Sequence, residues 1–257
     1  MRRLENKVAI VTGGGSGIGA ATAALFVQEG ARVLVVGRNL EKLRGTVQSI
    51  NHENISYSVA DVSKVEDTQR YVREAVERYG GLDVLISNAG YEGSAKHITE
   101  HTVEDFDLVM NTNVRGVWLS IKYAFPELQR RGGGSIVLTS SLVGVAGMAA
   151  HSAYTASKHA VIGLARALAH DGAPFHIRVN AVCPGVIDND MMASLHSRVA
   201  PGAEDQLKGA LTARVPLKRY GTNEEIARMN LFLASAESSY STGGVYLADG
   251  GVTAGLM

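Results

Sequence analysis

Short apolar runs recur along the whole chain, and longer segments with helical periodicity separate them. Each run is apolar throughout or nearly so, as expected for parallel strands that helices cover on both faces. The runs are residues 8–11, 33–36, 55–59, 84–86, 136–138, 177–182 and 245–247. This strand–helix alternation predicts a single α/β domain over residues 1–257, with a doubly wound parallel sheet of about seven strands between two helical layers.

Other sequence signals predict local features of this fold. Asn39 should cap the helix that follows it, because its side chain can accept a bond from a free backbone N–H. Pro126 should kink the helical stretch 114–131. The stretch 188–216 contains no strand pattern, so we expect it to form a helical flap inserted near the substrate.

Composition excludes several classes of protein. The net charge is zero, so we expect neither nucleic acid nor a membrane surface as a partner. Cys183 is the only cysteine, which excludes an internal disulfide and fits a reducing compartment. Residues 1–7 show no apolar signal core, and no stretch has the ~18 uncharged apolar residues of a membrane helix. We therefore expect a cytoplasmic protein.

A glycine-rich loop, residues 12–19, joins the first apolar run to the helix after it. Glycines there let the backbone turn sharply and bring amide groups and a helix N-terminus against a phosphate. The position after the first strand favours dinucleotide binding, although a methyltransferase that binds S-adenosylmethionine would share such a loop. The predicted contacts in the loop are Gly13, Gly15, Ser16, Gly17, Ile18 and Gly19.

Further motifs follow in a fixed order over nearly the whole chain. In chain order they are TGxxxGxG at 12–19, NAG at 88–90, NxxG at 113–116, a serine pair at 140–141, YxxxK at 154–158, PG at 184–185 and DGG at 249–251. This ordered set resembles the short-chain dehydrogenase/reductase (SDR) family. The resemblance implies a Rossmann-like fold and a nicotinamide cofactor, with no metal in the site.

The YxxxK pattern has a physical rationale. Tyr154 and Lys158 lie four residues apart on a predicted helix capped by Ser152, so they share one face. A free tyrosine has a pKa of ~10, and we expect the nearby ammonium to lower that pKa and make proton exchange accessible. The resemblance implies that Tyr154 exchanges a proton with the substrate and that Lys158 holds the nicotinamide ribose.

Two more residues complete the set that the resemblance implies. Ser141 should hydrogen-bond the substrate oxygen, and Asn113 should support a proton relay. In isolation, Ser141 would be read as a strand-end hydroxyl and Asn113 as a helix cap. The NxxG spacing favours Asn113 over its neighbour Asn111.

The resemblance also implies contacts along the rest of the cofactor. Asp61 and Val62 should contact the adenine, although Asp61 could instead form a local cap with Ser63. Asn189 stands where the family usually has a threonine that bonds the nicotinamide carboxamide, and an amide can make the same bond. The remaining predicted contacts are Asn88, Ala89, Gly90, Pro184, Gly185 and Ile187.

The end of the second apolar run bears on the choice of cofactor. An acid that binds the ribose hydroxyls of NAD is expected about 20 residues beyond the glycine loop. Gly37 takes its place and Arg38 follows. Because Arg38 can pair with a 2′-phosphate, NADP(H) is favoured and NAD(H) is the alternative. Arg38 could also point to solvent or stack on the adenine.

The motifs predict an oxidoreductase that moves a hydride between a nicotinamide cofactor and a ketone or secondary alcohol. The alternatives are a 3-oxoacyl-[acyl-carrier-protein] reductase and, from another class, a non-catalytic dinucleotide sensor. His151, three residues before Tyr154, could line the substrate pocket or lie on the surface. Ala160, Gly163 and Ala167 follow one another at about one helical turn. They could seat the helix on its own sheet or allow a close contact between subunits, and the resemblance implies a homotetramer.

Overall fold

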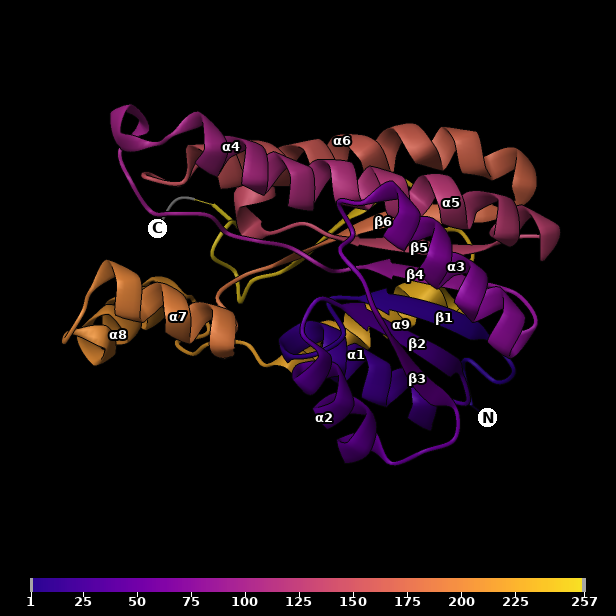
Figure 1. Cartoon of the computed structure of the whole chain (residues 1–257). Coiled ribbons are helices and arrows are strands. Elements are labelled where there is room, and N and C mark those ends of the chain that lie inside the picture. The colour runs from indigo at the N-terminus through magenta and orange to yellow at the C-terminus, as the bar shows by residue number, and fades with distance from the viewer. Residues whose placement is uncertain (1, 256–257) are drawn as a thin grey trace.

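The computed structural model describes residues 2–255, which contain one seven-stranded parallel sheet (Figure 1). The strand order across the sheet is β3-β2-β1-β4-β5-β6-β7. The strands are β1 (Val8–Thr12), β2 (Arg32–Gly37), β3 (Ile55–Val59), β4 (Val84–Ser87), β5 (Gly134–Thr139), β6 (Ile177–Pro184) and β7 (Val245–Ala248).

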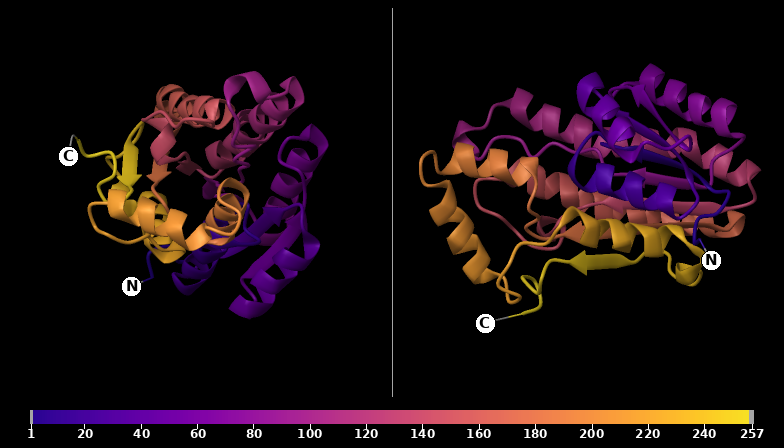
Figure 2. Two further views of the ribbon diagram at one scale, coloured as in Figure 1. Left: turned by 90° about the vertical axis from the view of Figure 1, so that its left-hand side faces the viewer. Right: turned by 90° about the horizontal axis from the view of Figure 1, so that it is seen from below.

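Helices cover both faces of this sheet (Figure 1). The helices on one face are α3 (Val65–Tyr79), α4 (Val103–Met110), α5 (Gly116–Arg130) and α6 (Ser152–Gly172). Those on the other are α1 (Gly17–Gln28), α2 (Leu40–Ile50) and α9 (Asn223–Ala234). Two further helices, α7 (Asp190–Val199) and α8 (Glu204–Arg214), project beyond the sheet (Figure 2).

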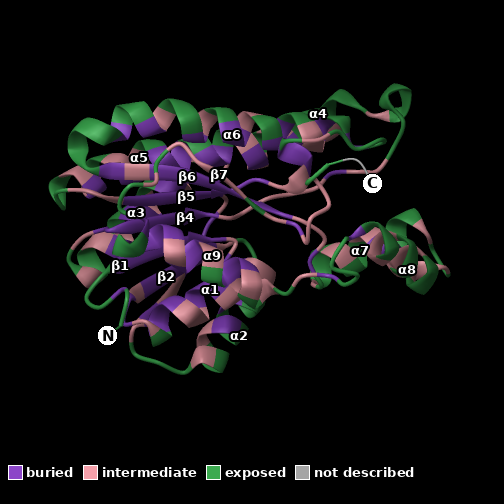
Figure 3. Cartoon of the chain, turned by 180° about the vertical axis from the view of Figure 1, so that it is seen from behind, coloured by how far each residue is buried: buried purple, intermediate pink, exposed green. Residues whose placement is uncertain are grey.

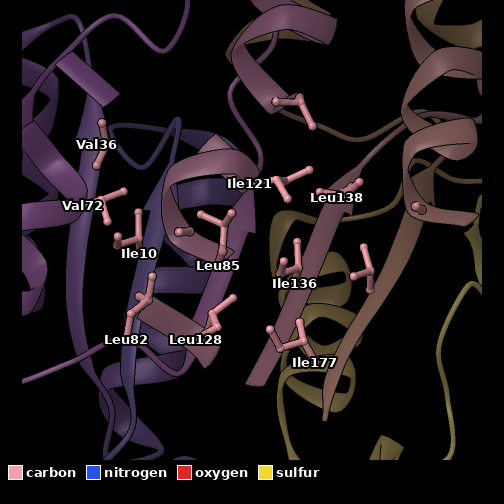
Figure 4. Packing of buried hydrophobic residues seen from close by; sticks show 14 of the residues in the cluster. Ile10, Val36, Val72, Leu82, Leu85, Ile121, Leu128, Ile136, Leu138 and Ile177 are labelled. Atoms are coloured by element: carbon pink, nitrogen blue, oxygen red, sulfur yellow. The ribbon is translucent and has the colours of Figure 1, made fainter. Parts of the chain in front are cut away.

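The central strands are buried on both faces, which explains their continuous apolar sequences (Figure 3). In β1, Ile10 packs into the cluster beneath α3, α5 and α6, whereas Ala9 and Val11 belong to the cluster beneath α1, α2 and α9. Figure 4 shows the first of these clusters, where Leu85 and Ile136 continue the layer across neighbouring strands. Successive residues of a strand thus supply two separate cores.

The strand order reverses between β1 and β4. The chain passes from β1 outward to β3, then returns to β4 and continues in the opposite direction to β7. Loops at the carboxyl ends of β1 and β4 therefore diverge, and ligands of doubly wound sheets bind in the crevice that this divergence creates. The helices α7 and α8, which fall in the range expected for a flap, lie next to these carboxyl ends (Figure 1).

The strands and helix caps predicted from the sequence can be compared with the structure. All seven apolar runs lie in strands, and Asn39 caps α2 by accepting a bond of 2.9 Å from Lys42 N. The helix α5 continues through Pro126. The predicted cap of α6 is wrong by one residue, because Ser152 already has helical geometry and His151 precedes it as the cap. Within residues 2–255, no helix combines the length and apolar character needed to cross a membrane.

Candidate active site

A cavity of about 410 Å³ lies at the carboxyl ends of the strands, between the sheet and the flap helices α7 and α8. The glycine loop, the ends of β4, β5 and β6 and the start of α6 line it from the sheet side. Ser141, Tyr154 and Lys158 all lie on its wall. Three of the four residues predicted to be catalytic are therefore brought together in one cavity.

The two residues of the YxxxK pattern lie on one face of α6, as their spacing predicts. The Nζ atom of Lys158 is 5.4 Å from the centre of the Tyr154 ring and donates a hydrogen bond of 2.9 Å to the carbonyl oxygen of Thr139. Lys158 is only 4% exposed. A Cβ on Gly90 would lie 3.4 Å from Nζ, so the lack of a side chain there leaves room beside the amine.

Burial dominates the electrostatics of this pair. It raises the pKa of Tyr154 to about 12, against a smaller lowering by the Ser141 side chain. It also lowers the pKa of Lys158 to about 8, because a buried ammonium loses its hydration. The structure of the protein alone thus reverses the predicted direction of the Tyr154 pKa shift, since the loss of solvent outweighs the lowering by Ser141.

Ser141 has both a local and a site-facing environment. Its hydroxyl caps the short turn Leu142–Gly144 by accepting a bond of 3.3 Å from Val143 N. The same side chain interacts with the Tyr154 hydroxyl and lines the cavity. The strand-end role and the predicted position beside the substrate are therefore compatible.

Asn113 lies apart from the cavity wall, in a π-helical turn over Asn111–Arg115. Its side chain clasps the backbone of Tyr91, with Nδ2 donating to the Tyr91 carbonyl and Oδ1 accepting from the Tyr91 N–H, each at 2.7 Å. Nδ2 also donates to Ser157 Oγ at 3.0 Å. Asn113 is buried whereas Asn111 is exposed, and the side chain of Asn113 connects the loop after β4 to α6.

The glycine loop meets the requirements for a phosphate contact. Gly13 and Gly17 have φ values of +67° and +54°, which L side chains rarely adopt. A Cβ on Gly19 would lie 2.2 Å from Gly13 O, so Gly19 allows α1 to pack closely on the loop. The first turn of α1 carries no acidic side chain, and Ser16 does not cap it through its hydroxyl. Its backbone donors are thus suited to an anion.

The chain is similar in sequence to known proteins. Residues 13–253 match the family model described as Enoyl-(Acyl carrier protein) reductase. A Sus scrofa protein named dehydrogenase/reductase SDR family member 4 is 36% identical over 98% of this chain and 89% of its own length. The chain belongs to the short-chain dehydrogenase/reductase family.

Two further relatives of this SDR protein have names that state an activity. A 3-oxoacyl-[acyl-carrier-protein] reductase FabG of Thermotoga maritima is 39% identical over 97% of this chain and 99% of its own. A levodione reductase of Leifsonia aquatica is 34% identical over 98% of this chain and 96% of its own. The crystal structure of levodione reductase matches with a TM-score of 0.96 at 34% identity, covering 99% of this chain and 100% of that one. The predicted family, Rossmann-like fold and oxidoreductase function are confirmed.

The cofactor contacts predicted for this SDR protein fall into two groups. Those on the cavity wall are Gly13, Ser16, Gly17, Ile18, Asn88, Ala89, Gly90, Tyr154, Lys158, Pro184, Gly185 and Ile187. The others are Gly15, Gly19, Arg38, Asp61 and Val62, which lie outside that wall. The wall combines a glycine cradle, a helix N-terminus and a buried amine, a set that fits a dinucleotide carrying a nicotinamide ribose.

Asp61 adopts the local arrangement that the sequence left open. Its Oδ1 accepts bonds from the backbone N–H and the hydroxyl of Ser63, at 3.0 and 2.8 Å. Burial raises the pKa of Asp61, but the Ser63 bonds and the charge of Arg38 bring it below its usual value. Arg38 and Asp61 follow the ends of the neighbouring strands β2 and β3, whose last residues, Gly37 and Val59, pair with each other.

Sequence reasoning missed most of the flap's contribution to the site. Glu92 lines the cavity and forms an ion pair with Arg198 of α7, which also donates to the carbonyl of Gly93 at 3.2 Å. The apolar side chains that line the same wall are Met148, Met191, Met192, Leu195, Val199, Leu207 and Leu211. The helical spacing of these residues in 191–199 and 207–211 is the sequence signal that could have identified them.

Asn189 lines the cavity at the start of the flap but is already engaged. Its Oδ1 caps α7 by accepting from Met192 N at 3.1 Å, and its Nδ2 donates to Asn223 Oδ1 at 3.2 Å. Residues 97–101 match the HxxEH pattern of some zinc peptidases. They surround a short 3₁₀ turn, so the two histidines do not project from one α-helix as such a zinc site would require.

Replacing Lys158 by methionine should change how stability depends on pH. The pKa of Lys158 is about 8 in the folded chain against an ordinary value of 10.5. Between these pH values the unfolded chain carries a proton on Lys158 that the folded chain does not, so the protein loses stability as the pH falls from 10.5 to 8. The free energy of unfolding of wild type relative to Lys158→Met should therefore rise by about 1.4 kcal/mol per pH unit between these values.

Urea unfolding of the cofactor-free protein at several pH values tests this, at one protein concentration throughout. Tyr154 is present in both proteins, so its own titration cancels in the difference. Lys122→Met removes an exposed lysine of α5 and serves as the control. If the difference in free energy of unfolding between wild type and Lys158→Met changes as little with pH as the difference between wild type and Lys122→Met, the Lys158 charge is not desolvated.

Proposed function

We propose that this SDR oxidoreductase reduces a small ketone, or oxidises the matching secondary alcohol, with NADP(H). The observation that carries the proposal is that Tyr154, Ser141 and Lys158 lie together on the wall of one mostly apolar cavity. Ser141 interacts with the Tyr154 hydroxyl, and the Lys158 amine lies 5.4 Å from the Tyr154 ring. When bound, the dihydronicotinamide supplies the hydride that adds to the carbonyl carbon. In the same step, the Tyr154 O–H bond breaks and its proton passes to the carbonyl oxygen.

The protein's own groups prepare this proton transfer. The high pKa of Tyr154 keeps the phenol protonated at neutral pH, which is the form that donates to a carbonyl oxygen. Ser141 holds that oxygen beside the phenol. The positive charge of Lys158, 5.4 Å from the ring, stabilises the phenolate that remains. Asn113 positions α6 by donating to the hydroxyl of Ser157. That hydroxyl in turn donates to the backbone carbonyl oxygen of Tyr154 at 2.7 Å.

Replacing Tyr154 by phenylalanine should abolish most of the activity, because it removes the proton donor. We expect kcat/KM for the best substrate of a ketone panel with NADPH to fall by about 10² to 10⁴. Ser141→Ala should also reduce kcat/KM, whereas Tyr240→Phe changes a fully exposed residue and is the control. A wild type that turns over no ketone or alcohol in a broad panel would favour the dinucleotide sensor.

A small ketone is favoured over an acyl group on a carrier protein. An acidic carrier needs free positive charge at the mouth of the site, but three cations that contact the flap or lie in it are paired with acids. Lys208 bonds Asp188 at 3.1 Å, Lys42 bonds Asp190 at 3.3 Å, and Arg198 pairs with a glutamate inside the cavity. The 3-oxoacyl-[acyl-carrier-protein] reductase activity is the second candidate, because relatives of comparable identity have that name.

The preference for NADP(H) rests on the end of β2. Arg38 is exposed there, two residues beyond Val36, whose carbonyl oxygen accepts a bond of 3.2 Å from Gly14 N of the glycine loop. No carboxylate occupies position 37 to repel a 2′-phosphate. A Cβ on Gly37 would meet Leu43 at 3.5 Å, which is an ordinary contact. An aspartate can therefore be introduced at position 37 without displacing the backbone, and NAD(H) remains the alternative cofactor.

Gly37→Asp and Arg38→Ala should each lower the ratio of kcat/KM for NADPH to that for NADH. A charge-assisted bond contributes ~1.5–3 kcal/mol, so we expect a decrease of about 10- to 150-fold. Arg44→Ala, which removes an exposed arginine from α2, should leave the ratio unchanged. If wild type prefers NADH and Arg38→Ala does not alter the ratio, NADP(H) is the wrong cofactor.

We also propose a homotetramer in the cytoplasm. Gly163 and Ala167 are exposed on α6, and no atom lies within 4 Å of a Cβ built on Gly163. These small residues therefore face away from the sheet, which leaves a smooth helix face for a second subunit. Phe106 of α4 and Trp118 of α5 are 44% and 45% exposed.

The reducing cytoplasm suits the unpaired thiol of Cys183.

Light scattering at micromolar concentration should give about four times the chain mass of 27.2 kDa. Gly163→Arg should yield a smaller species, because a long charged side chain would prevent close approach of α6. Gly45→Arg adds the same side chain to α2, where space around the Cβ is equally open, and should remain tetrameric. A wild-type mass of 27 kDa would exclude the tetramer.

A further inference from the structure

His151 is a polar residue of the cavity wall that the proposed reaction does not use. It precedes α6 as the cap residue, three positions before Tyr154, and lines the same cavity. Only 7% of the residue is exposed. Residues three apart at a helix start lie about one turn from each other, so the imidazole and the phenol can contact one small molecule.

The hydrogen bonding of His151 defines what its free nitrogen can do. Nδ1 lies 3.0 Å from the carbonyl oxygen of Ala149. A carbonyl oxygen only accepts, so Nδ1 carries the proton, and Nε2 of the neutral imidazole is then an acceptor. Nε2 is buried and has no partner among residues 2–255. Buried acceptors without a donor are rare because they cost free energy, so a donor from the ligand is expected.

The surroundings of His151 limit the chemistry of that donor. Met148, Met191 and Leu195 contribute apolar side chains to the same wall. A cationic donor would need an anionic partner in this apolar space. The two carboxylates on the wall are already paired, Glu92 with Arg198 and Asp190 with Lys42. A neutral hydroxyl donates one hydrogen bond and requires no counter-charge. A neutral donor therefore suits the cavity, and for a ketone or alcohol substrate we take this donor to be a hydroxyl group.

We propose that the substrate carries, besides its reacting carbonyl, a hydroxyl group that donates a hydrogen bond to Nε2 of His151. This inference rests on the proposed function, and it narrows the substrate class to hydroxyketones with a compact apolar body, or to the diols formed from them. Ser141 and Tyr154 hold the reacting oxygen, and His151 holds the second one. His151 thus determines specificity and orientation, and takes no part in the proton transfer.

Matched substrates test the role of the hydroxyl. The ratio of kcat/KM for each ring isomer of hydroxycyclohexanone to that for cyclohexanone is measured with NADPH. We expect at least one isomer to be preferred by about 10-fold in wild type, mainly through a lower KM, which is the effect of one good hydrogen bond. If no isomer is preferred over cyclohexanone, the proposal is overturned.

Two substitutions separate substrate recognition from a structural role. The amide of glutamine in His151→Gln can place an acceptor near the position of Nε2, whereas asparagine in His151→Asn reproduces only the position of Nδ1. We expect the glutamine variant to retain part of the hydroxyl preference and the asparagine variant to lose it. The opposite order would assign His151 a structural role. His159→Leu, which removes an exposed histidine of α6 that contacts a carbonyl through Nδ1, is the control.

A binding measurement keeps this inference distinct from the proposed activity. Calorimetric titration of Tyr154→Phe, saturated with NADPH, compares the affinities for the same ketones without turnover. If wild type turns over none of them but the variant prefers a hydroxyketone, and His151→Asn in that background removes the preference, the activity proposal fails and the hydroxyl site stands. Equal affinities for cyclohexanone and every hydroxycyclohexanone would overturn the hydroxyl site.

Discussion

The hydrogen bonds between Thr12 and the segment after β4 join the two strands at which the order of the sheet reverses. Thr12 Oγ1 accepts from the N–H groups of Asn88 and Ala89, each at 3.0 Å, and Asn88 Nδ2 donates to Thr12 O at 3.1 Å. Asn88 Oδ1 in turn accepts from Thr139 Oγ1 at 3.4 Å, and the Thr139 carbonyl holds Lys158. One buried network thus fixes the glycine loop, three strand ends and the Lys158 amine relative to one another.

The sequence was sufficient for the fold because its signals are local or periodic. Continuous apolar runs identify strands buried on both faces, and the ordered motifs place the loops at their carboxyl ends. The YxxxK spacing likewise predicted that Tyr154 and Lys158 share a helix face. The direction of the Tyr154 pKa shift was not predictable, because it depends on solvent that distant segments exclude.

Non-local contacts account for the other differences. The expected support of a proton relay by Asn113 stays a prediction, but spacing could not show that its side chain bonds Tyr91, which lies 22 residues earlier, and Ser157, 44 residues later. The engagement of Asn189 depends in the same way on Asn223, a residue 34 positions away. Composition and spacing give no information about such partners. The unpaired nitrogen of His151 also became visible only when the neighbours of each polar atom were known.

The site combines features that folding alone would not favour. Tyr154 and Lys158 are both removed from water, and desolvation opposes the charged form of each. A buried ammonium with a backbone carbonyl as its hydrogen-bond partner is less stable than an apolar side chain of similar size. The proposed activity therefore requires residues of α6 that stability alone would disfavour.

Cys183, the only thiol of the chain, lies fully buried in β6 between two neighbouring strands. Burial raises its pKa, so the unreactive thiol form dominates while the sheet is intact. A disulfide reagent can then modify it only during transient opening of the sheet, and the labelling rate reports how often β6 separates from its neighbours. The modification rate of this thiol therefore measures the local opening of β6, the strand that leads into the flap.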